Sequence, residues 1–209
     1  MSDVEDMQFH DYLESLLGSR VSIRLVRALI NYAGKIFTVR KLAEAAGVSS
    51  SEAALVVQEL EKFGILKIQP VGRSYLISLN NKSYILAKIL KPTIKAEEGT
   101  LDELVSILNR NLNDKSIISA VLFGSVAMKR EREDSDIDVL VISNDFEAAS
   151  GFTSKAREDI SSIFNSRLSP LIMSERELLA KKNDRLVSSI LHNHIIIKGK
   201  DLKEVIRDQ

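Results

Sequence analysis

The sequence contains no cysteine and few aromatic side chains. Cysteine is absent from all 209 residues, which excludes disulfides, thiolate catalysis and cysteine-based zinc sites. Only three histidines are present, so any metal ion has to be held by oxygen ligands or by these histidines. Aromatic residues make up 5% of the chain, and too few tyrosines lie in any one place to form a platform that stacks nucleic-acid bases.

Long apolar runs and a secretory signal are also missing. The longest apolar runs are far too short to span a bilayer. The first ten residues, MSDVEDMQFH, are acidic and lack the basic-then-apolar pattern of a signal peptide. We therefore expect a cytoplasmic protein that does not enter a membrane.

The formal net charge of zero hides an uneven distribution of charge. Residues 8–91 carry twelve Lys and Arg against six Asp and Glu, whereas residues 92–209 carry seventeen against twenty. A basic N-terminal half beside an acidic C-terminal half indicates two modules with different partners. Unevenly scattered surface charge is the alternative interpretation.

The N-terminal part has the pattern of three helices and a hairpin. Apolar residues at helical spacing predict a helix over 20–33, and Thr38 can cap a short second helix that Gly47 closes. Ser50 or Ser51 can cap the third helix, SSEAALVVQELEKFG, before the strands ILKIQP and SYLISL.

This order resembles a winged helix-turn-helix over about residues 8–80. We expect residues 1–80 to form that domain, followed by a connector at 81–100. In the connector, the helical piece SYILAKIL should stop at Pro92, and KAEEGT should be loose.

If the winged module binds DNA, its third helix should enter the major groove and its basic residues should contact phosphate. The candidate DNA-binding residues are Arg40, Lys41, Ser51, Gln58 and Arg73. Such modules often read paired half-sites, so a homodimer is expected. Protein contacts through the wing are the alternative.

Residues 101–209 alternate between strands and helices after a capping Thr100. Mostly non-amphipathic strands indicate a mixed sheet covered by helices. The fold class expected for the whole chain is therefore α/β (α+β), with an N-terminal winged helix-turn-helix and a C-terminal sheet domain.

The stretch LFGSVAMKREREDSDIDVLVIS combines features of a phosphate and metal site. Gly124 lets the backbone turn tightly, and Ser125 can cap a helix whose free N–H groups favour a phosphate. Asp136 and Asp138 stand two apart on a strand, which sends both carboxylates to the same side. Mg²⁺ is suited to such a pair, since it takes one or two carboxylates and completes its shell with water and substrate phosphates.

Gly-Ser, about ten residues and Asp-x-Asp resemble the minimal nucleotidyltransferases of the DNA polymerase β-like superfamily. The resemblance covers roughly residues 100–200. It implies that Ser125 helps to hold a nucleoside triphosphate, and that Asp136 and Asp138 bind Mg²⁺ or Mn²⁺ and act in catalysis. From the residues themselves, Gly124 admits a bulky group close to the main chain, and the basic side chain of Lys129 can reach the triphosphate; a solvated charged loop is the alternative for Lys129. The implied reaction is attack by an acceptor oxygen on the α-phosphate, with pyrophosphate leaving.

Two positions depart from that family pattern. Lys129 replaces a glycine, and the expected third acid of a later strand falls on Ser169 or Pro170. The first hypothesis is therefore an Mg²⁺-dependent transferase that acts on an unknown acceptor, which includes a partner protein as modification target. The alternative is a DNA-binding regulator whose degenerate transferase domain binds nucleotide or mediates assembly without catalysis.

Overall fold

The computed structural model describes residues 13–72 and 74–208. The chain divides into two compact units between Glu98 and Gly99, and each is described by itself. In the described residues, no helix combines the length and the apolar character that a membrane crossing requires.

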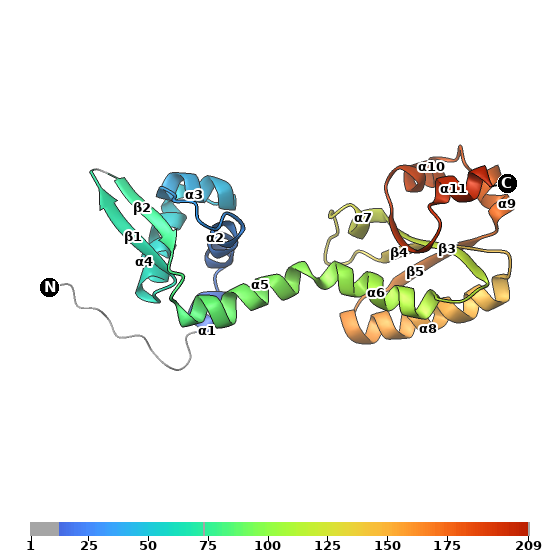
Figure 1. Cartoon of the computed structure of the whole chain (residues 1–209), viewed down its shortest axis with the longest axis horizontal. Coiled ribbons are helices and arrows are strands. Elements are labelled where there is room, and N and C mark those ends of the chain that lie inside the picture. The colour runs from blue at the N-terminus through green and yellow to red at the C-terminus, as the bar shows by residue number, and fades with distance from the viewer. Residues whose placement is uncertain (1–12, 73, 209) are drawn as a thin grey trace. The chain divides into compact units, whose positions relative to one another are not determined.

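The first unit consists of helices followed by a two-stranded hairpin (Figure 1). Strands β1 and β2 are antiparallel, and Leu66 lies opposite Leu79. Three helices, α2 to α4, followed by this hairpin confirm the expected winged helix-turn-helix order. The elements of this unit are α1 (Leu13–Leu17), α2 (Arg20–Asn31), α3 (Val39–Ala46), α4 (Ser50–Lys62), β1 (Leu66–Val71), β2 (Ser74–Leu79), the π-helix η1 (Leu86–Leu90) and α5 (Lys91–Glu98).

Local capping sets the helix-turn-helix. The Thr38 hydroxyl accepts a hydrogen bond from the Lys41 N–H at 3.4 Å, as its position before α3 predicts. Gly47 ends α3 in the left-handed region at φ +64°. The expectation that Ser50 or Ser51 caps α4 is wrong: Ser49 is the cap, and its hydroxyl accepts from the Glu52 N–H at 3.2 Å. The same hydroxyl also bonds the Glu52 carboxylate at 2.6 Å, which favours Ser49 over its neighbours.

Within the connector, SYILAKIL is helical as expected, but KAEEGT, which was expected to be loose, is also helical as far as Glu98. Pro92 does not stop the helix, because it lies in the first turn of α5, directly after the π-helix η1. A proline has no N–H and its ring crowds the preceding turn, and the wider π-helical turn accommodates both effects. Four side chains of the connector are buried in the core of the first unit: Ile85, Leu86, Leu90 and Ile94.

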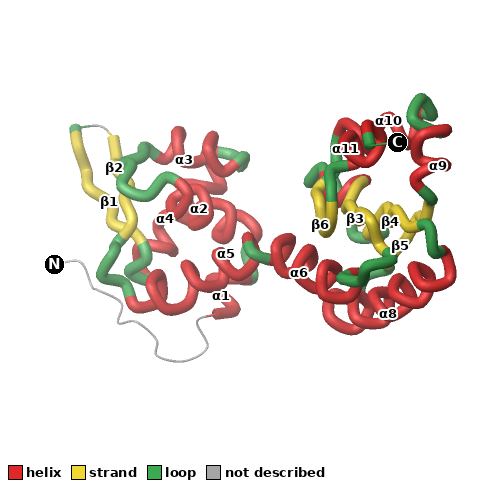
Figure 2. Tube along the Cα trace, turned by 45° about the vertical axis from the view of Figure 1, so that its right-hand side comes forward, coloured by secondary structure: helices red, strands yellow, loops and turns green. Residues whose placement is uncertain are grey.

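The second unit is a four-stranded sheet with helices on both faces (Figure 2). The strand order is β5-β4-β3-β6; β3 is antiparallel to β4 and β6, and β4 is parallel to β5. This mixed sheet confirms the expected fold class. The elements are α6 (Thr100–Leu112), β3 (Ile117–Phe123), α7 (Gly124–Ala127), β4 (Ile137–Ser143), α8 (Phe146–Phe164), β5 (Leu168–Met173), α9 (Glu175–Ala180), α10 (Arg185–His192), β6 (Ile195–Gly199) and α11 (Leu202–Arg207).

Each face of this sheet has its own core. Helices α6 and α8 cover one face, and α9, α10 and α11 cover the other (Figure 1). Along β4, Val139 points to the α6/α8 side and Leu140 to the opposite side. Because side chains alternate along a strand, Asp138 lies on the side of Leu140. The expected cap Thr100 is the first residue of α6, and Gly99 occupies the cap position.

Strand β5 forms one edge of the sheet and contains a proline. Pro170 lies opposite Val139 of β4. Proline cannot donate a backbone hydrogen bond, so it is tolerated in a sheet at edge positions. Pro170 therefore suits a strand with a neighbour on one side only.

Candidate functional site

The Gly-Ser turn lies at the end of β3. Gly124 adopts φ +76° and opens α7, a helix of only four residues. Phe123 occupies the N-cap position, and no side chain makes a capping hydrogen bond there. The expectation that Ser125 caps the helix after β3 is therefore wrong, because Ser125 is the second residue of α7.

Asp138 lies directly against this turn. It is the register partner of Phe123 across the β3–β4 pair. A Cβ atom added to Gly124 would lie 2.2 Å from the Asp138 Oδ2 atom. Only glycine therefore fits at position 124 while this carboxylate keeps its place.

The surroundings of Asp138, at the start of β4, disfavour its charge. Asp138 is partly buried, and this burial raises its pKa; the nearby Asp136 carboxylate raises the pKa further. A cation between two such carboxylates offsets both effects. The donor set of two carboxylate oxygens fits Mg²⁺ or Mn²⁺ that keeps some water and takes its other ligands from phosphate.

Ser169 on β5 lies beside Asp138. In the parallel pair of β4 and β5, Asp138 is the register partner of Ser169 and Val139 of Pro170. Within residues 13–72 and 74–208, no group of three or more His, Cys, Asp or Glu side chains is arranged to hold a metal ion. Ser169 thus occupies the place beside Asp138 where a third carboxylate was expected.

Lys129 has an unusual backbone conformation. Its φ is +54°, and its side chain is exposed. An L-residue in this left-handed region costs about 1–2 kcal/mol relative to a right-handed conformation, which explains why the family pattern has a glycine here. The Lys129 N–H donates to the Val126 carbonyl at 3.1 Å, which holds this turn beside Ser125.

A polar cavity of about 560 Å³ adjoins the carboxylate pair. Asp136 forms part of its wall, together with residues from the end of α8 and the start of β5. The other polar lining residues include Arg157, Asn165, Ser166, Arg167 and Ser169. Sequence reasoning did not find this group, because a separation of more than twenty residues from Asp136 to Arg157 leaves no local pattern.

The candidate DNA-binding residues lie in the first unit. Arg40 and Lys41 are exposed in the first turn of α3, and Ser51 and Gln58 are exposed on α4. Arg73 lies outside the described residues. The exposed side of α4 also carries acidic Glu52 and Glu59, and Leu55 with 67% of its surface accessible.

Comparison with known proteins assigns the second unit. Residues 102–203 match the family model described as "Polymerase beta, Nucleotidyltransferase". The second unit is a polymerase beta-type nucleotidyltransferase domain. This confirms the resemblance inferred from Gly124–Ser125 and the two aspartates. No curated protein matches the chain.

Several solved structures resemble parts of the chain. The AntR antimony-specific transcriptional repressor is 17% identical, with 49% of this chain and 96% of that chain covered and a TM-score of 0.38. A toxin–antitoxin with AMP-PNP is 16% identical, with 52% and 82% covered and a TM-score of 0.35. TrmBL2, an archaeal chromatin protein, is 16% identical, with 86% and 75% covered and a TM-score of 0.29. With TM-scores this low, no functional assignment follows from these likenesses.

Gly124→Ala tests the contact between the nucleotidyltransferase turn and Asp138. The positive φ alone should lower the free energy of unfolding by about 1–2 kcal/mol, and the close approach to Asp138 Oδ2 should add to this loss. Denaturant unfolding measures the change. Gly151→Ala, in the middle of α8 with open space around it, is the matched control and should raise stability by about 0.5–1 kcal/mol.

The double variant Gly124→Ala/Asp138→Ala separates the two causes. Removing the carboxylate should restore the part of the unfolding free energy that is lost through crowding against Asp138. The part that is lost through the positive φ of the backbone should remain. Equal losses in the single and double variants would show that the carboxylate does not constrain position 124.

Lys129→Gly tests the strained turn of the nucleotidyltransferase domain. Glycine adopts φ +54° without steric cost, so the free energy of unfolding should rise by about 1 kcal/mol. Denaturant midpoints measure it. Lys181→Gly, at a position with φ −95°, should instead leave stability unchanged or lower it, and a gain of the same size there would contradict the strain at Lys129.

Proposed function

We propose that the chain transfers a nucleoside monophosphate from a nucleoside triphosphate to a hydroxyl acceptor, in a reaction that depends on Mg²⁺ or Mn²⁺. The observation that carries this proposal is the close approach of Asp138 to the backbone of Gly124. It brings Asp138 against the Gly-Ser turn, which supports a site where the phosphates of a nucleotide and a divalent cation would meet. A partly buried carboxylate with a raised pKa beside a second carboxylate is typical of a functional site rather than of a structural ion pair.

Each residue has a separate part in this proposal. Asp136 and Asp138 hold the divalent cation, and Gly124 keeps space for Asp138. Ser125 and Lys129 contact the triphosphate, one from the turn itself and the other from its exposed end. The bound cation neutralises charge on the reacting phosphate and on the leaving pyrophosphate.

A second candidate function follows from Ser169. Its place beside Asp138 in the sheet register leaves two acids where active relatives are expected to have three. The domain would then bind nucleotide without turnover, and the chain would act as a DNA-binding regulator. Nucleotide binding is common to both candidates, and pyrophosphate release distinguishes them.

We further propose that the first unit binds DNA through α3 and α4. Support comes from the winged helix-turn-helix order and from the exposure of Arg40, Lys41, Ser51 and Gln58. Arg24 stabilises the turn between these helices, because its guanidinium donates to the Gly47 carbonyl at 3.3 Å. A homodimer would present two such units to paired half-sites.

Nucleotidyl transfer is tested by incubation with labelled nucleoside triphosphates and Mg²⁺ or Mn²⁺. We expect the wild type to release pyrophosphate, and the rate should fall at least a hundredfold in Asp136→Asn and Asp138→Asn. The reason is that a neutral amide carries no negative charge to offset the charge of the divalent cation. Asp138→Asn should fold at least as stably as the wild type, since the raised pKa of Asp138 marks an unfavourable buried charge. Thermal unfolding of each variant is the control for folding.

Ser169→Asp sharpens the same experiment. A third carboxylate beside Asp138 should tighten Mn²⁺ binding about tenfold, and it should introduce turnover only if the wild type is the inactive regulator. Nucleotide binding by the wild type without pyrophosphate release, together with turnover in Ser169→Asp, would reject the enzyme in favour of the regulator.

DNA binding is tested by the dependence of affinity on salt. Each phosphate contact contributes about 0.9 to the slope of log affinity against log salt, so Arg40→Ala and Lys41→Ala should each reduce the slope by about one. Gln58→Ala should change the preferred sequence and leave the slope unchanged. Lys115→Ala, in the other unit, is the control, and unchanged slopes in the α3 variants would remove Arg40 and Lys41 from the DNA contact.

A further inference from the structure

The cavity beside Asp136 has the lining of an anion site. Arg157 and Arg167 supply two guanidinium groups, and the hydroxyls of Ser166 and Ser169 and the amide of Asn165 supply neutral hydrogen-bonding groups. Paired guanidiniums favour phosphate, because their fork of N–H donors matches its oxygens. No aromatic residue lines the cavity, so it offers no surface on which a nucleic-acid base can stack.

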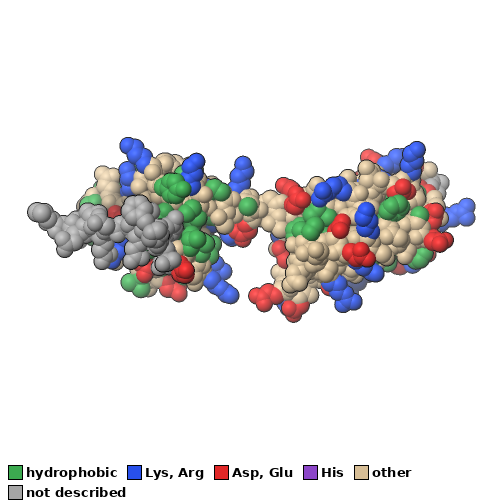
Figure 3. All heavy atoms as spheres, turned by 90° about the horizontal axis from the view of Figure 1, so that it is seen from below, with side chains coloured by type: hydrophobic (Ala, Val, Ile, Leu, Met, Phe, Trp, Pro, Cys, Tyr) green, Lys and Arg blue, Asp and Glu red, His purple; other side chains and the backbone are tan. Residues whose placement is uncertain are grey.

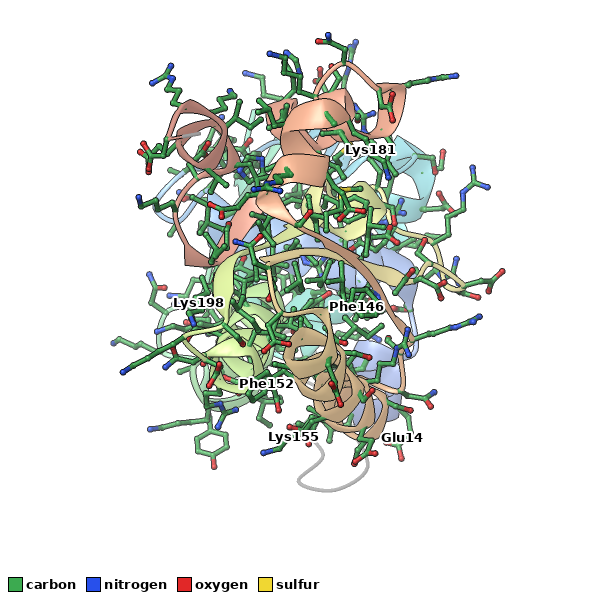
Figure 4. All side chains as sticks on the ribbon, turned by 90° about the vertical axis from the view of Figure 1, so that its right-hand side faces the viewer. Glu14, Phe146, Phe152, Lys155, Lys181 and Lys198 are labelled. Carbon is green, nitrogen blue, oxygen red and sulfur yellow. The ribbon has the colours of Figure 1, made fainter. Side chains whose placement is uncertain are left out.

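The backbone around the cavity holds these side chains in place. The Arg157 Nε donates to the Leu168 carbonyl at 3.3 Å, which holds the guanidinium at the wall through its Nε and not through its terminal amino groups. Figure 4 follows α8 from Phe146 through Phe152 to Lys155, two residues before Arg157. Asn165, in the left-handed region at φ +49°, ends α8 and turns the chain toward β5.

Arg167 is tied to the carboxylate strand. Its carbonyl accepts a hydrogen bond from the Ile137 N–H at 2.8 Å. Ile137 lies between Asp136 and Asp138, so this backbone hydrogen bond links Arg167 to the segment that carries both carboxylates. The face of the second unit seen in Figure 3 carries charges of both signs.

The strand order places this cavity opposite the Gly-Ser turn. Phe123 on β3, Asp138 on β4 and Ser169 on β5 are neighbours across the sheet. Ser125 follows β3 on one side of the aspartates, and the cavity adjoins β5 on the other. In phosphoryl transfer the attacking and leaving oxygens lie roughly in line on opposite sides of the phosphorus. If the triphosphate lies at the Gly-Ser turn, the acceptor must approach from the side of the cavity.

We propose that this cavity is the acceptor subsite, and that it takes a small hydroxyl compound that carries a phosphate group, such as a phosphorylated sugar. The inference rests on the proposed nucleotidyl transfer. Arg157 and Arg167 bind the phosphate and leave a hydroxyl of the same molecule beside Asp136. A volume of about 560 Å³ suits a compound of this size.

The transfer step balances with these groups alone. The acceptor hydroxyl oxygen forms a bond to the α-phosphorus while the bond from that phosphorus to the bridging oxygen breaks. Pyrophosphate takes the bonding electrons and leaves on the side of Ser125, and the hydroxyl proton passes to water in the open cavity.

Ser169 has a direct role in this proposal. It lies both beside Asp138 and on the cavity wall. A carboxylate there would add negative charge to the surface that an anionic acceptor has to approach. Serine in place of a third acid therefore matches the chemistry of the cavity.

The test uses ribose 5-phosphate and inorganic phosphate as probes of the full chain. Titration calorimetry should show that Arg157→Gln and Arg167→Gln each weaken ribose 5-phosphate binding about tenfold, and that Ser169→Asp also weakens it. Arg185→Gln, at an exposed position of α10, should bind as the wild type does. Thermal unfolding confirms that each variant is folded.

Nucleotide binding in the same samples separates this inference from the proposed function. We expect the affinity for a non-hydrolysable nucleoside triphosphate to be unchanged in both arginine variants, and both ligands to bind together. Loss of nucleotide affinity, or competition between the ligands, would show that the arginines hold the triphosphate and would overturn the acceptor subsite.

Two further outcomes also overturn it. One is the absence of ribose 5-phosphate binding by the wild type while nucleotide still binds, which leaves the proposed transfer intact. The other is preferential, arginine-dependent binding of a short single-stranded oligonucleotide, which would assign the cavity to a nucleic-acid end.

Discussion

The arrangement of the Gly-Ser turn and Asp138 in the nucleotidyltransferase domain depends on the absence of a Cβ atom at Gly124. Because Gly124 has no Cβ, the Asp138 carboxylate can lie against the backbone at the end of β3. That contact joins the two central strands of the sheet at the point where the Gly-Ser turn begins. It also confines a negative charge in a partly buried place, which is unfavourable until a cation is bound.

Features set by adjacent residues were the most predictable. Thr38 and Gly47 were identified correctly as the ends of α3, because an N-cap hydroxyl and a left-handed glycine act within a single turn. The Gly-Ser and Asp-x-Asp spacing likewise identified the domain. Errors arose where neighbouring residues compete for one role: Ser49 rather than Ser50 caps α4, because it alone also bonds Glu52. The prediction that the helix stops at Pro92 was also wrong, because the preceding π-helical turn accommodates the proline and the helix continues.

Tertiary features of the site could not be predicted from the sequence. Arg157 lies on the solvent side of a long amphipathic helix, where an arginine is expected for solubility alone. Only the left-handed turn at Asn165 brings that helix face next to Arg167 and the start of β4. Ser169 is a further example: the sequence shows only that it stands where a third acid was expected, whereas the structure shows that it lines the cavity.

Pro170 has a consequence for how copies of the molecule can associate. Pro170, in the middle of β5, has no N–H to donate to a further strand. Pairing of another chain's strand with the edge of the sheet at β5 is therefore weakened. Ser169 precedes Pro170 on the same edge, and the entrance to the cavity therefore stays clear of intermolecular strand pairing. Assembly of copies through main-chain hydrogen bonds at this edge is therefore disfavoured, so a neighbouring chain paired to β5 does not cover the cavity.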